Sequence, residues 1–484
     1  MVNVKWLMVI GYSLLLSACS QPPRTVTTPT AVTPVPTQAQ LDWHDMRMNA
    51  FIHFTINTFT DREWGMGSES PKEFNPTDLN VEQWIGVLKE TGFKGVILTC
   101  KHHDGFCLWP SEFTDHDISK SPFMGGKGDI VRLVSDACKK NGLKFGVYLS
   151  PWDRNHKDYG KPEYITYYRN QLNELFDNYG PVFEMWFDGA NGGDGYYGGA
   201  NEKRRIDGST YYDWPNTLDL VRKKNPDIIF FSDAGPGVRW VGNEKGIAGE
   251  TNWNNISTDT LHAGKAGIEA LLNTGSENGT SWVPAETDVS IRPGWFYHAK
   301  EDTMVKAPER LFDIYLRSVG HGSVLLLNIP PDRRGLFHEE DVKALKGFRE
   351  MLDNEFKTDL TKGSESEATN VRGESDSYAA SNVIDNNPET YWATDDGVVS
   401  AQLILKFGEV KKIKYVKLAE YIKLGQRVKS FKLVYHKDGK WFDLAEGTTI
   451  GHERIFEVSA ETDAVKLIVN DAKACPLISA MEIY

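Results

Sequence analysis

Cysteine is scarce in this chain, and its cysteines form none of the spacings that mark a metal or redox site. Five cysteines occur among 484 residues, and no Cys-x-x-Cys pair is present. Cys100 and Cys138 fall among apolar neighbours, in patterns that indicate a strand and a helix. We therefore expect buried thiols, while any disulfide pairing among Cys100, Cys107, Cys138 and Cys475 stays open.

The chain is also low in positive charge and in long apolar runs. Lysine and arginine total 54 against 67 aspartates and glutamates, a net charge of −13, and the basic residues are scattered. This balance argues against a nucleic-acid partner and indicates a substrate that is not strongly anionic. The apolar run at residues 7–16 is too short to cross a bilayer stably.

The N-terminus has the pattern of a bacterial lipoprotein signal. Lys5 precedes the apolar run and Leu-Ser-Ala-Cys follows it, so Cys19 is the expected site of cleavage and lipidation. The alternative is an ordinary cleavage site that contains a cysteine by chance. Residues 1–18 are predicted to be a signal peptide, and residues 19–40, rich in Thr and Pro, a poorly ordered tether. Ser20 favours the outer membrane, so we expect a lipid-anchored protein of the bacterial cell envelope that faces the periplasm or the surface.

The most informative stretch is residues 182–190, an apolar run that ends in Asp188 and then a glycine. A buried strand tolerates a carboxylate only at an end, where solvent or a substrate satisfies it. Trp186 and Asp188 are two residues apart and therefore share a face of an extended strand. An aromatic ring beside a carboxylate suits a sugar, although a strand-terminal Asp that only caps a loop is the plainer interpretation of this one site.

The same design recurs, which favours the functional interpretation. Short apolar runs with polar tips occupy residues 50–54, 95–106 and 144–150, and helical patterns at residues 81–91, 130–141 and 164–179 separate them. Strand, polar tip and helix in repetition predict an α/β fold, a (β/α)8 TIM barrel with its site at the carboxyl ends of the strands. We assign residues 41–358 to this barrel.

Later elements are less regular. Residues 189–211 form a long loop over the site, residues 227–233 a fifth strand with residues 234–244 as its loop, and residues 281–288 and 323–330 further strands. A helix at residues 338–356 closes the barrel. We expect a linker at residues 359–376 and, from the short alternating runs beyond it, an all-β sandwich at residues 377–484.

Glycoside hydrolysis needs two carboxyl groups, one at the anomeric carbon and one that protonates the leaving oxygen. Asp188 supplies the first, and the candidates for the second are Asp233, Glu244, Glu250, Glu286 and Asp288. A metal hydrolase is the alternative, because His53, His102, His103 and Asp104 are possible ligands. Consecutive strand residues point to opposite faces, however, and no HxH or HExxH motif is present.

Four motifs, in order, resemble the retaining α-L-fucosidases of glycoside hydrolase family 29: FIHF at residues 51–54, EWG at 63–65, KHHDGF at 101–106 and WFDG at 186–189. The resemblance covers residues 41–356 and implies that Asp188 is the nucleophile and that no cofactor is needed. The resemblance also implies a fucose pocket formed by His53, Glu63, Trp64, His102, His103, Tyr148, Trp186 and Arg239. We add Trp295 as apolar surface for the sugar.

Residues 239–244 resemble the branch that is selective for α-1,3 and α-1,4 linkages, which implies Glu244 as acid/base, with Glu286 as runner-up. The expected substrates are Lewis-type fucosylated glycans, and the alternative is a broad or α-1,2-preferring fucosidase. A different class, a sugar-binding lipoprotein without catalysis, is the further alternative, and the oligomeric state stays open.

Residues 380–392 resemble the opening of discoidin-like (F5/8 type C) domains, which are often carbohydrate-binding modules. The resemblance implies a structural Ca²⁺ near Asp385 and Thr390. A sandwich that only supports the barrel is as compatible with the sequence as one that binds sugar.

Overall fold

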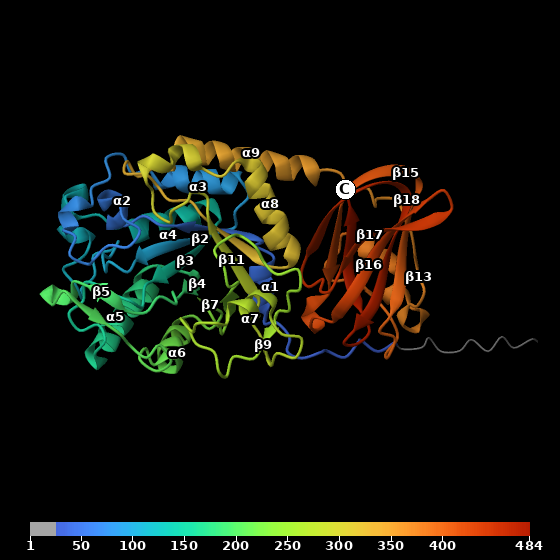
Figure 1. Ribbon diagram of the computed structural model, residues 1–484, viewed down its shortest axis with the longest axis horizontal. Helices are drawn as coiled ribbons and strands as arrows, with labels where there is room; N and C mark the ends of the chain where they lie inside the picture. The colour runs from blue at the N-terminus through green and yellow to red at the C-terminus, as the bar shows by residue number, and fades with distance from the viewer. Residues whose placement is uncertain (1–25) are drawn as a thin grey trace, which may run out of the picture.

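The computed structural model describes residues 26–484, which form two domains side by side (Figure 1). In the first, eight parallel strands close into a barrel in the order β1-β12-β11-β8-β7-β4-β3-β2. The predicted TIM barrel is therefore confirmed. Its strands are β1 (Met48–Ile52), β2 (Gly95–Lys101), β3 (Lys144–Leu149), β4 (Val182–Trp186), β7 (Ile229–Ser232), β8 (Val238–Trp240), β11 (Ala285–Ser290) and β12 (Val324–Asn328).

Helices surround the barrel, and local sequence explains where they begin and end. In α4 (Ile130–Asn141), the Asp129 side chain accepts the Arg132 amide at the start, and Gly142 ends the helix in the left-handed conformation, with φ of 79°. Its apolar stripe faces the strands. The other helices are α1 (Gln38–His44), α2 (Ile56–Thr60), α3 (Val81–Glu90), α5 (Pro162–Asn178), α6 (Trp214–Lys224), α7 (Glu269–Thr274), α8 (Pro308–Ser318) and α9 (Glu339–Glu355).

The sixth barrel strand, β8, corrects the prediction that residues 234–244 are only a loop. It has three residues and follows Pro236 and Gly237, so it carries too little alternation to be recognised in the sequence. The strand predicted at residues 281–288 is also divided. Ser281–Trp282 (β10) pairs with Asn255–Ile256 (β9) outside the barrel, and β11 begins after Pro284.

Aromatic and aliphatic side chains fill the barrel interior, and α1 closes its amino end. Trp43 of α1 is buried and belongs to the same apolar cluster as Phe51, Tyr148 and Trp186, and its indole N–H donates to Glu184 Oε2 at 3.1 Å. A helix before the first strand thus completes the core. The four remaining cysteines, Cys100, Cys107, Cys138 and Cys475, are free and buried, as predicted.

The second domain is an antiparallel β-structure with its own apolar core, which confirms the predicted all-β domain. The linker predicted at residues 359–376 is wrong, because β13 (Glu365–Ala368) lies inside it and pairs with β15 (Ala401–Glu420). Leu360 N–H also donates to the Ile483 carbonyl at 2.7 Å. The other strands are β14 (Trp392–Ala393), β16 (Val428–Lys437), β17 (Lys440–Gly447), β18 (Arg454–Ala472) and β19 (Leu477–Ile483).

The Thr/Pro-rich segment is ordered along the second domain from residue 26 onward. Arg372 donates to the Thr27 carbonyl at 2.7 Å, Arg427 to that of Thr30 at 2.7 Å, and Val32 N–H to that of Leu424 at 2.9 Å. A poorly ordered tether is therefore wrong for residues 26–40. Cys19 and the predicted signal peptide lie outside the described residues, and none of the helices at residues 26–484 has the length and apolarity of a membrane span.

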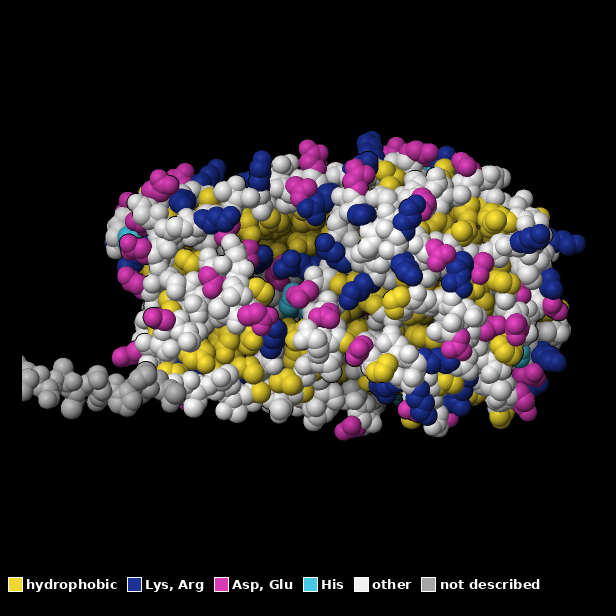
Figure 2. Space-filling view, turned by 180° about the vertical axis from the view of Figure 1, so that it is seen from behind, with side chains coloured by type: hydrophobic (Ala, Val, Ile, Leu, Met, Phe, Trp, Pro, Cys, Tyr) yellow, Lys and Arg dark blue, Asp and Glu magenta, His cyan; other side chains and the backbone are white. Residues whose placement is uncertain are grey.

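The second domain packs against the amino end of the barrel, away from the strand tips (Figure 1). Arg47, just before β1, pairs with Glu453 at 2.9 Å, and the Asn254 N–H donates to Gln426 Oε1 at 2.8 Å. On the face in Figure 2, acidic and basic side chains are interspersed and form no patch of one sign. Because the second domain lies at the amino end, a site at the carboxyl ends of the strands consists of barrel residues alone.

Candidate active site

Asp188 follows β4 and lies at the carboxyl end of the barrel, where three groups surround its carboxylate. The Tyr148 hydroxyl donates to Oδ2 at 2.9 Å, the Ala190 N–H donates to Oδ1 at 2.7 Å, and His103 Nε2 lies 3.7 Å from Oδ2. A Cβ at Gly189 would collide with the carboxylate of Asp233, which explains the glycine. The Asp188 side chain is 24% exposed, so its carboxylate is held in place and still open to a ligand.

Three buried histidines line the same end of the barrel. His53 Nδ1 lies 2.8 Å from Asn328 Oδ1, His103 Nδ1 lies 2.7 Å from Ser150 Oγ, and the rings of His102 and His103 are 4.1 Å apart. Burial lowers the pKa of all three, to about 3 for His53. Neutral imidazoles can each donate and accept, which suits sugar hydroxyls. Within residues 26–484, no three His, Cys, Asp or Glu side chains converge as metal ligands do.

Aromatic rings form the floor and the rim of the site. Trp186 stacks on Phe231 with 3.9 Å between ring centroids and donates its indole N–H to Glu286 Oε1 at 2.9 Å. Trp295 lies 5.2 Å from the His53 ring. Trp64 is 54% exposed and meets His103 edge-on at 5.2 Å. Exposure of a large indole beside a carboxylate is typical of sugar-binding sites.

Glu63 is partly exposed, and its carboxylate bonds to the loop after β11. Its Oε2 accepts the Trp295 N–H at 2.8 Å, and its Oε1 accepts the Phe296 N–H at 3.1 Å and lies 2.8 Å from His298 Nε2. Three of its acceptor positions are therefore used inside the protein. Its contact with a fucose hydroxyl stays a prediction.

Glu244 lies at the rim, in the loop after β8. The Trp295 indole N–H donates to its Oε2 at 3.3 Å. Partial burial raises the pKa of Glu244, the bond from Trp295 opposes this, and the negative charges of Asp188 and Glu63 add to the rise. A carboxyl whose pKa is raised by a nearby carboxylate suits the role of a general acid.

Glu286 does not reach the site, which makes its selection as runner-up acid/base wrong. It is fully buried beneath Trp186, beside Glu184 in the barrel interior. Burial raises the pKa of both carboxyls, and for Glu286 the charge of Glu184 adds to the effect. Strand periodicity places Glu286 and Asp288 on one face but does not reveal how deep in the barrel each lies.

The remaining acid candidates have other partners. Asp288 is buried and accepts the Trp240 indole N–H at 2.9 Å. Glu250 is exposed and its charge acts on Arg454 of the second domain. Asp233 lies beside Gly189 and accepts the Gly264 N–H at 2.7 Å, and burial raises its pKa to about 6 with a contribution from Asp188. Of these three, Asp233 is the one that adjoins Asp188.

Arg239 does not line the pocket, so this prediction is wrong. Its guanidinium is fully buried outside the barrel, where it donates to the Leu272 carbonyl at 2.8 Å, the Trp253 carbonyl at 3.0 Å, Asn252 Oδ1 at 3.0 Å and the Val283 carbonyl. Alternation along β8 sends the next side chain, Trp240, inward instead. Arg239 therefore ties β8 to the segments around it.

Two residues at the site were missed in the sequence. Asn328 lies at the tip of β12, where its Nδ2 donates to the Trp295 carbonyl at 2.8 Å and its Oδ1 meets His53. A polar tip after an apolar run was the signal for it, the same one that identified Asp188. His298 lies between Asp61 and Glu63 in a loop, and no periodic pattern could have indicated it.

The long excursion at residues 189–211 is pinned to its neighbours rather than free. It contains the hairpin β5 (Gly193–Gly195) and β6 (Glu202–Arg204). The Tyr196 N–H donates to the Met66 carbonyl at 2.9 Å and the Tyr197 N–H to that of Arg154 at 2.8 Å. These bonds hold the hairpin in place next to the loop that carries Trp64.

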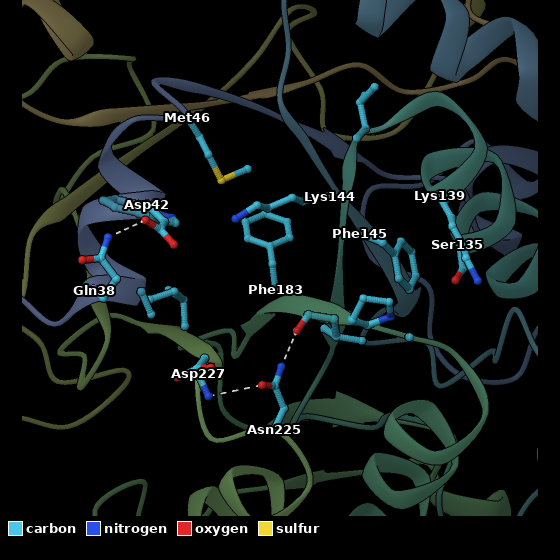
Figure 3. Close-up of a pocket in the computed structure, with 17 residues that line it drawn as sticks. Gln38, Asp42, Met46, Ser135, Lys139, Lys144, Phe145, Phe183, Asn225 and Asp227 are labelled. Atoms are coloured by element: carbon cyan, nitrogen blue, oxygen red, sulfur yellow. Dashed lines mark hydrogen bonds between the residues drawn. The ribbon is translucent and has the colours of Figure 1, made fainter. Parts of the chain in front are cut away.

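A cavity of about 440 Å³ lies at the opposite, amino end of the barrel, between α1, α4 and the beginnings of β3, β4 and β7 (Figure 3). Phe145, Phe183 and Ile229 give it an apolar lining, and polar groups at its edge bond to one another, such as Gln38 Nε2 with Asp42 Oδ1 at 2.7 Å. It contains none of the predicted catalytic side chains.

A TIM barrel that carries a held carboxylate, a second carboxyl with a raised pKa at the rim and aromatic rings at the same end has the arrangement of a glycoside hydrolase. Residues 28–355 match the α-L-fucosidase family, and residues 362–483 match the F5/8 type C domain family. The chain therefore belongs to the α-L-fucosidases of glycoside hydrolase family 29, and it carries an F5/8 type C domain.

Individual relatives agree with this assignment. Alpha-L-fucosidase 1 of Arabidopsis thaliana is 41% identical over 462 residues, which cover 94% of this chain and 88% of that protein. A glycoside hydrolase 29 family member from a rumen bacterium is 42% identical with a TM-score of 0.84, covering 94% and 78% of the two chains. A Ruminococcus gnavus GH29 fucosidase in complex with fucose is 34% identical with a TM-score of 0.86, covering 95% and 97%.

Proposed function

We propose that this α-L-fucosidase is a retaining exo-enzyme that releases fucose from α-1,3- and α-1,4-fucosylated, Lewis-type glycans through a fucosyl-Asp188 intermediate. The observation that carries the proposal is the presence of a partly exposed carboxylate, Asp188, and a rim carboxyl, Glu244, whose pKa is raised in part by the charge of Asp188. Retention needs a nucleophile and a separate acid/base, and these two residues can fill the roles.

In the first step, Asp188 attacks the anomeric carbon while Glu244 gives its proton to the leaving oxygen. The bonds from Tyr148 and Ala190 hold the Asp188 carboxylate in one orientation before the attack. The negative charge of Asp188 also helps Glu244 to keep its proton until the sugar binds.

In the second step, the loss of the negative charge on Asp188 lets Glu244 change from acid to base. Once Asp188 is esterified, its negative charge is gone, and Glu244 as a carboxylate takes a proton from water. The water oxygen attacks the anomeric carbon, the ester bond breaks and Asp188 regains its charge. His53, His102 and His103, neutral at pH 7, are proposed to bind the fucose hydroxyls, and Trp64, Trp186 and Trp295 its apolar surface.

The stereochemical course tests the retaining mechanism. We expect wild-type enzyme to release α-L-fucose first, which then mutarotates, because two displacements at the anomeric carbon restore its configuration. Proton NMR of the anomeric region in the first minutes of turnover measures this directly. Initial release of the β-anomer would exclude the ester intermediate.

A panel of fucosylated oligosaccharides tests the linkage. We expect ready release of fucose from branched Lewis-type trisaccharides and at least about tenfold lower kcat/KM on α-1,2-fucosyl-lactose, because the neighbouring galactose of a branched acceptor can add contacts in the transition state. The fixed hairpin at residues 193–204 and Trp64 offer surfaces for such contacts. Equal kcat/KM on both linkages would favour a broad fucosidase.

We also propose that Cys19 is lipidated and anchors the enzyme in the bacterial cell envelope. The lipoprotein signal pattern of the sequence supports this. Metabolic labelling with a palmitate analogue should mark the wild-type chain and not Cys19→Ala. Equal labelling of both chains would contradict the anchor.

A Ca²⁺ site in the second domain is a further proposal. Asp385 Oδ2 accepts the Thr390 hydroxyl at 2.7 Å, and the Asn387 carbonyl oxygen lies 2.9 Å from the same hydroxyl oxygen, so three oxygens of the kind that Ca²⁺ prefers lie close together. Asp385 and Thr390 would hold the ion together with backbone carbonyls. Millimolar CaCl2 should then raise the Tm of the wild-type chain and not of Asp385→Asn; an equal effect on both would locate the ion elsewhere.

A further inference from the structure

His298 joins two carboxylates at the edge of the site without facing the sugar-binding space itself. Its Nδ1 lies 2.7 Å from Asp61 Oδ1, and its Nε2 lies 2.8 Å from Glu63 Oε1. The ring is almost completely buried. Both ring nitrogens are therefore occupied, Nδ1 by Asp61 and Nε2 by Glu63.

Glu63 in turn fixes the backbone of the Trp295 loop. It accepts the N–H groups of Trp295 and Phe296, and a Cβ at Gly294 would lie only 2.5 Å from its Oε1, so the loop backbone presses against the carboxylate. On its other side, the Trp295 carbonyl accepts a bond from Asn328 at 2.8 Å. Both backbone polar groups of Trp295 are thus held, and its indole has a defined position.

The Trp295 indole ends this chain of contacts at Glu244, to which it donates at 3.3 Å. We propose that His298 is a positioning residue for proton transfer: by bridging Asp61 and Glu63 it holds the Trp295 loop, and Trp295 holds the Glu244 carboxyl where the leaving oxygen departs. This inference rests on the proposed role of Glu244 as acid/base.

The charge of His298 fits a bridge between two carboxylates. Burial lowers the pKa of His298, but the bonds to Asp61 and Glu63 outweigh it and raise the pKa above the ordinary value. As an imidazolium, His298 donates from both nitrogens, one to each carboxylate. A glutamine in its place has one amide NH2 group and cannot span both partners in the same way.

The test compares two leaving groups in the His298→Gln enzyme. Protonation matters for a sugar leaving group and little for an activated aryl group. We expect kcat on a Lewis-type trisaccharide to fall about tenfold or more, since small misplacement of a catalytic group is costly, while kcat on an activated aryl α-L-fucoside changes less than about threefold. Trp295→Phe, which removes the indole donor and keeps a ring, should also lose more on the trisaccharide than on the aryl fucoside, in addition to any loss common to both substrates from its place in the fucose pocket.

His338→Gln is the matched control. His338 is the N-cap of α9, lies 3.5 Å from Asp302 and does not contact Glu63 or Trp295, so its loss should leave the ratio of the two rates unchanged. Equal losses on both substrates in His298→Gln, with a lowered Tm, would mean a purely structural role and overturn the proposal. An unchanged ratio of the rates on trisaccharide and aryl fucoside in both His298→Gln and Trp295→Phe would also overturn the proposal.

Glu244→Ala separates the two ways in which the inference can fail. If Glu244→Ala shows the leaving-group asymmetry and His298→Gln does not, only the positioning role is wrong. If Glu244→Ala itself shows no asymmetry, the assignment of the proton donor is wrong and the positioning role falls with it.

Discussion

Asp188→Ala is expected to lower kcat on an aryl α-L-fucoside by at least about 10⁴-fold, since the proposed ester between Asp188 and the anomeric carbon can no longer form. Asp188→Asn should lose a similar factor, because it keeps the shape and removes the charge. Steady-state and single-turnover rates of purified enzyme measure the loss. Wild-type-like kcat in either variant would exclude Asp188 as nucleophile.

The fold of this variant should survive. Asp188 follows the end of β4 and is partly exposed, and its removal leaves only the Tyr148 hydroxyl and the Ala190 N–H to find water. Each such bond contributes about 1 kcal/mol, and loss of Asp188 also removes a negative charge that raises the pKa of Asp233 and Glu244. We expect a Tm within a few degrees of wild type. Asp194→Asn, in the hairpin beside the site, is the control for full activity.

The polar strand tips were the part of the site that could be predicted from sequence. Asp188, Tyr148 and the histidines each end an apolar run, and parallel strands bring their carboxyl ends to one edge of the barrel. Asn328 obeys the same rule. His298 and the anchoring of Glu63 could not be predicted, because loop contacts between residues more than 200 positions apart leave no periodic trace.

The alternation of side chains along a strand also does not predict how deep in the barrel a residue lies. Glu286 and Asp288 share a face of β11, yet Glu286 lies beneath Trp186 and pairs with Glu184, and Asp288 bonds to Trp240. Arg239 illustrates a related error, because a three-residue strand placed inside a presumed loop reverses which side chains point inward.

Composition was a poor guide to order at the N-terminus and between the domains. Thr- and Pro-rich sequence favours an extended chain, and residues 26–37 contain no helix or strand, but Arg372 and Arg427 of the second domain bind the carbonyls of Thr27 and Thr30. The Ser- and Glu-rich stretch at residues 359–376 likewise supplies an edge strand, β13. In both segments, tertiary hydrogen bonds decide the structure.

Glu244→Ala is expected to lose far more activity on substrates with a poor leaving group than on activated ones, because an acid catalyst matters most when the leaving group is poor. Hydrolysis of Lewis-type oligosaccharides should fall about 10²- to 10⁴-fold, while formation of the fucosyl-enzyme from an activated aryl fucoside is largely spared. The ester then accumulates, because no base activates water. Azide needs no base, so it should accelerate turnover and yield α-fucosyl azide, whereas azide in Asp188→Ala should give the β-product from a single displacement.

The pH profile supplies an independent readout of the same residue. A general acid works while protonated, so kcat/KM of the wild-type enzyme on oligosaccharides should fall as the pH rises through the pKa of Glu244, and the raised pKa moves this basic limb upward. Glu244→Ala should lose that limb. Its presence in Glu244→Ala would assign the proton donor to another group, of which Asp233, beside Asp188, is the first to replace.

Glu286→Gln is the matched comparison, because it substitutes a carboxyl that is buried under Trp186. The amide can still accept the Trp186 indole N–H and donate toward Glu184, so both buried partners stay satisfied. We expect activity within about threefold of wild type on oligosaccharide and aryl substrates alike, an unchanged basic limb and no acceleration by azide. Azide rescue of Glu286→Gln with none in Glu244→Ala would reverse the assignment and require that the barrel interior open to the leaving group.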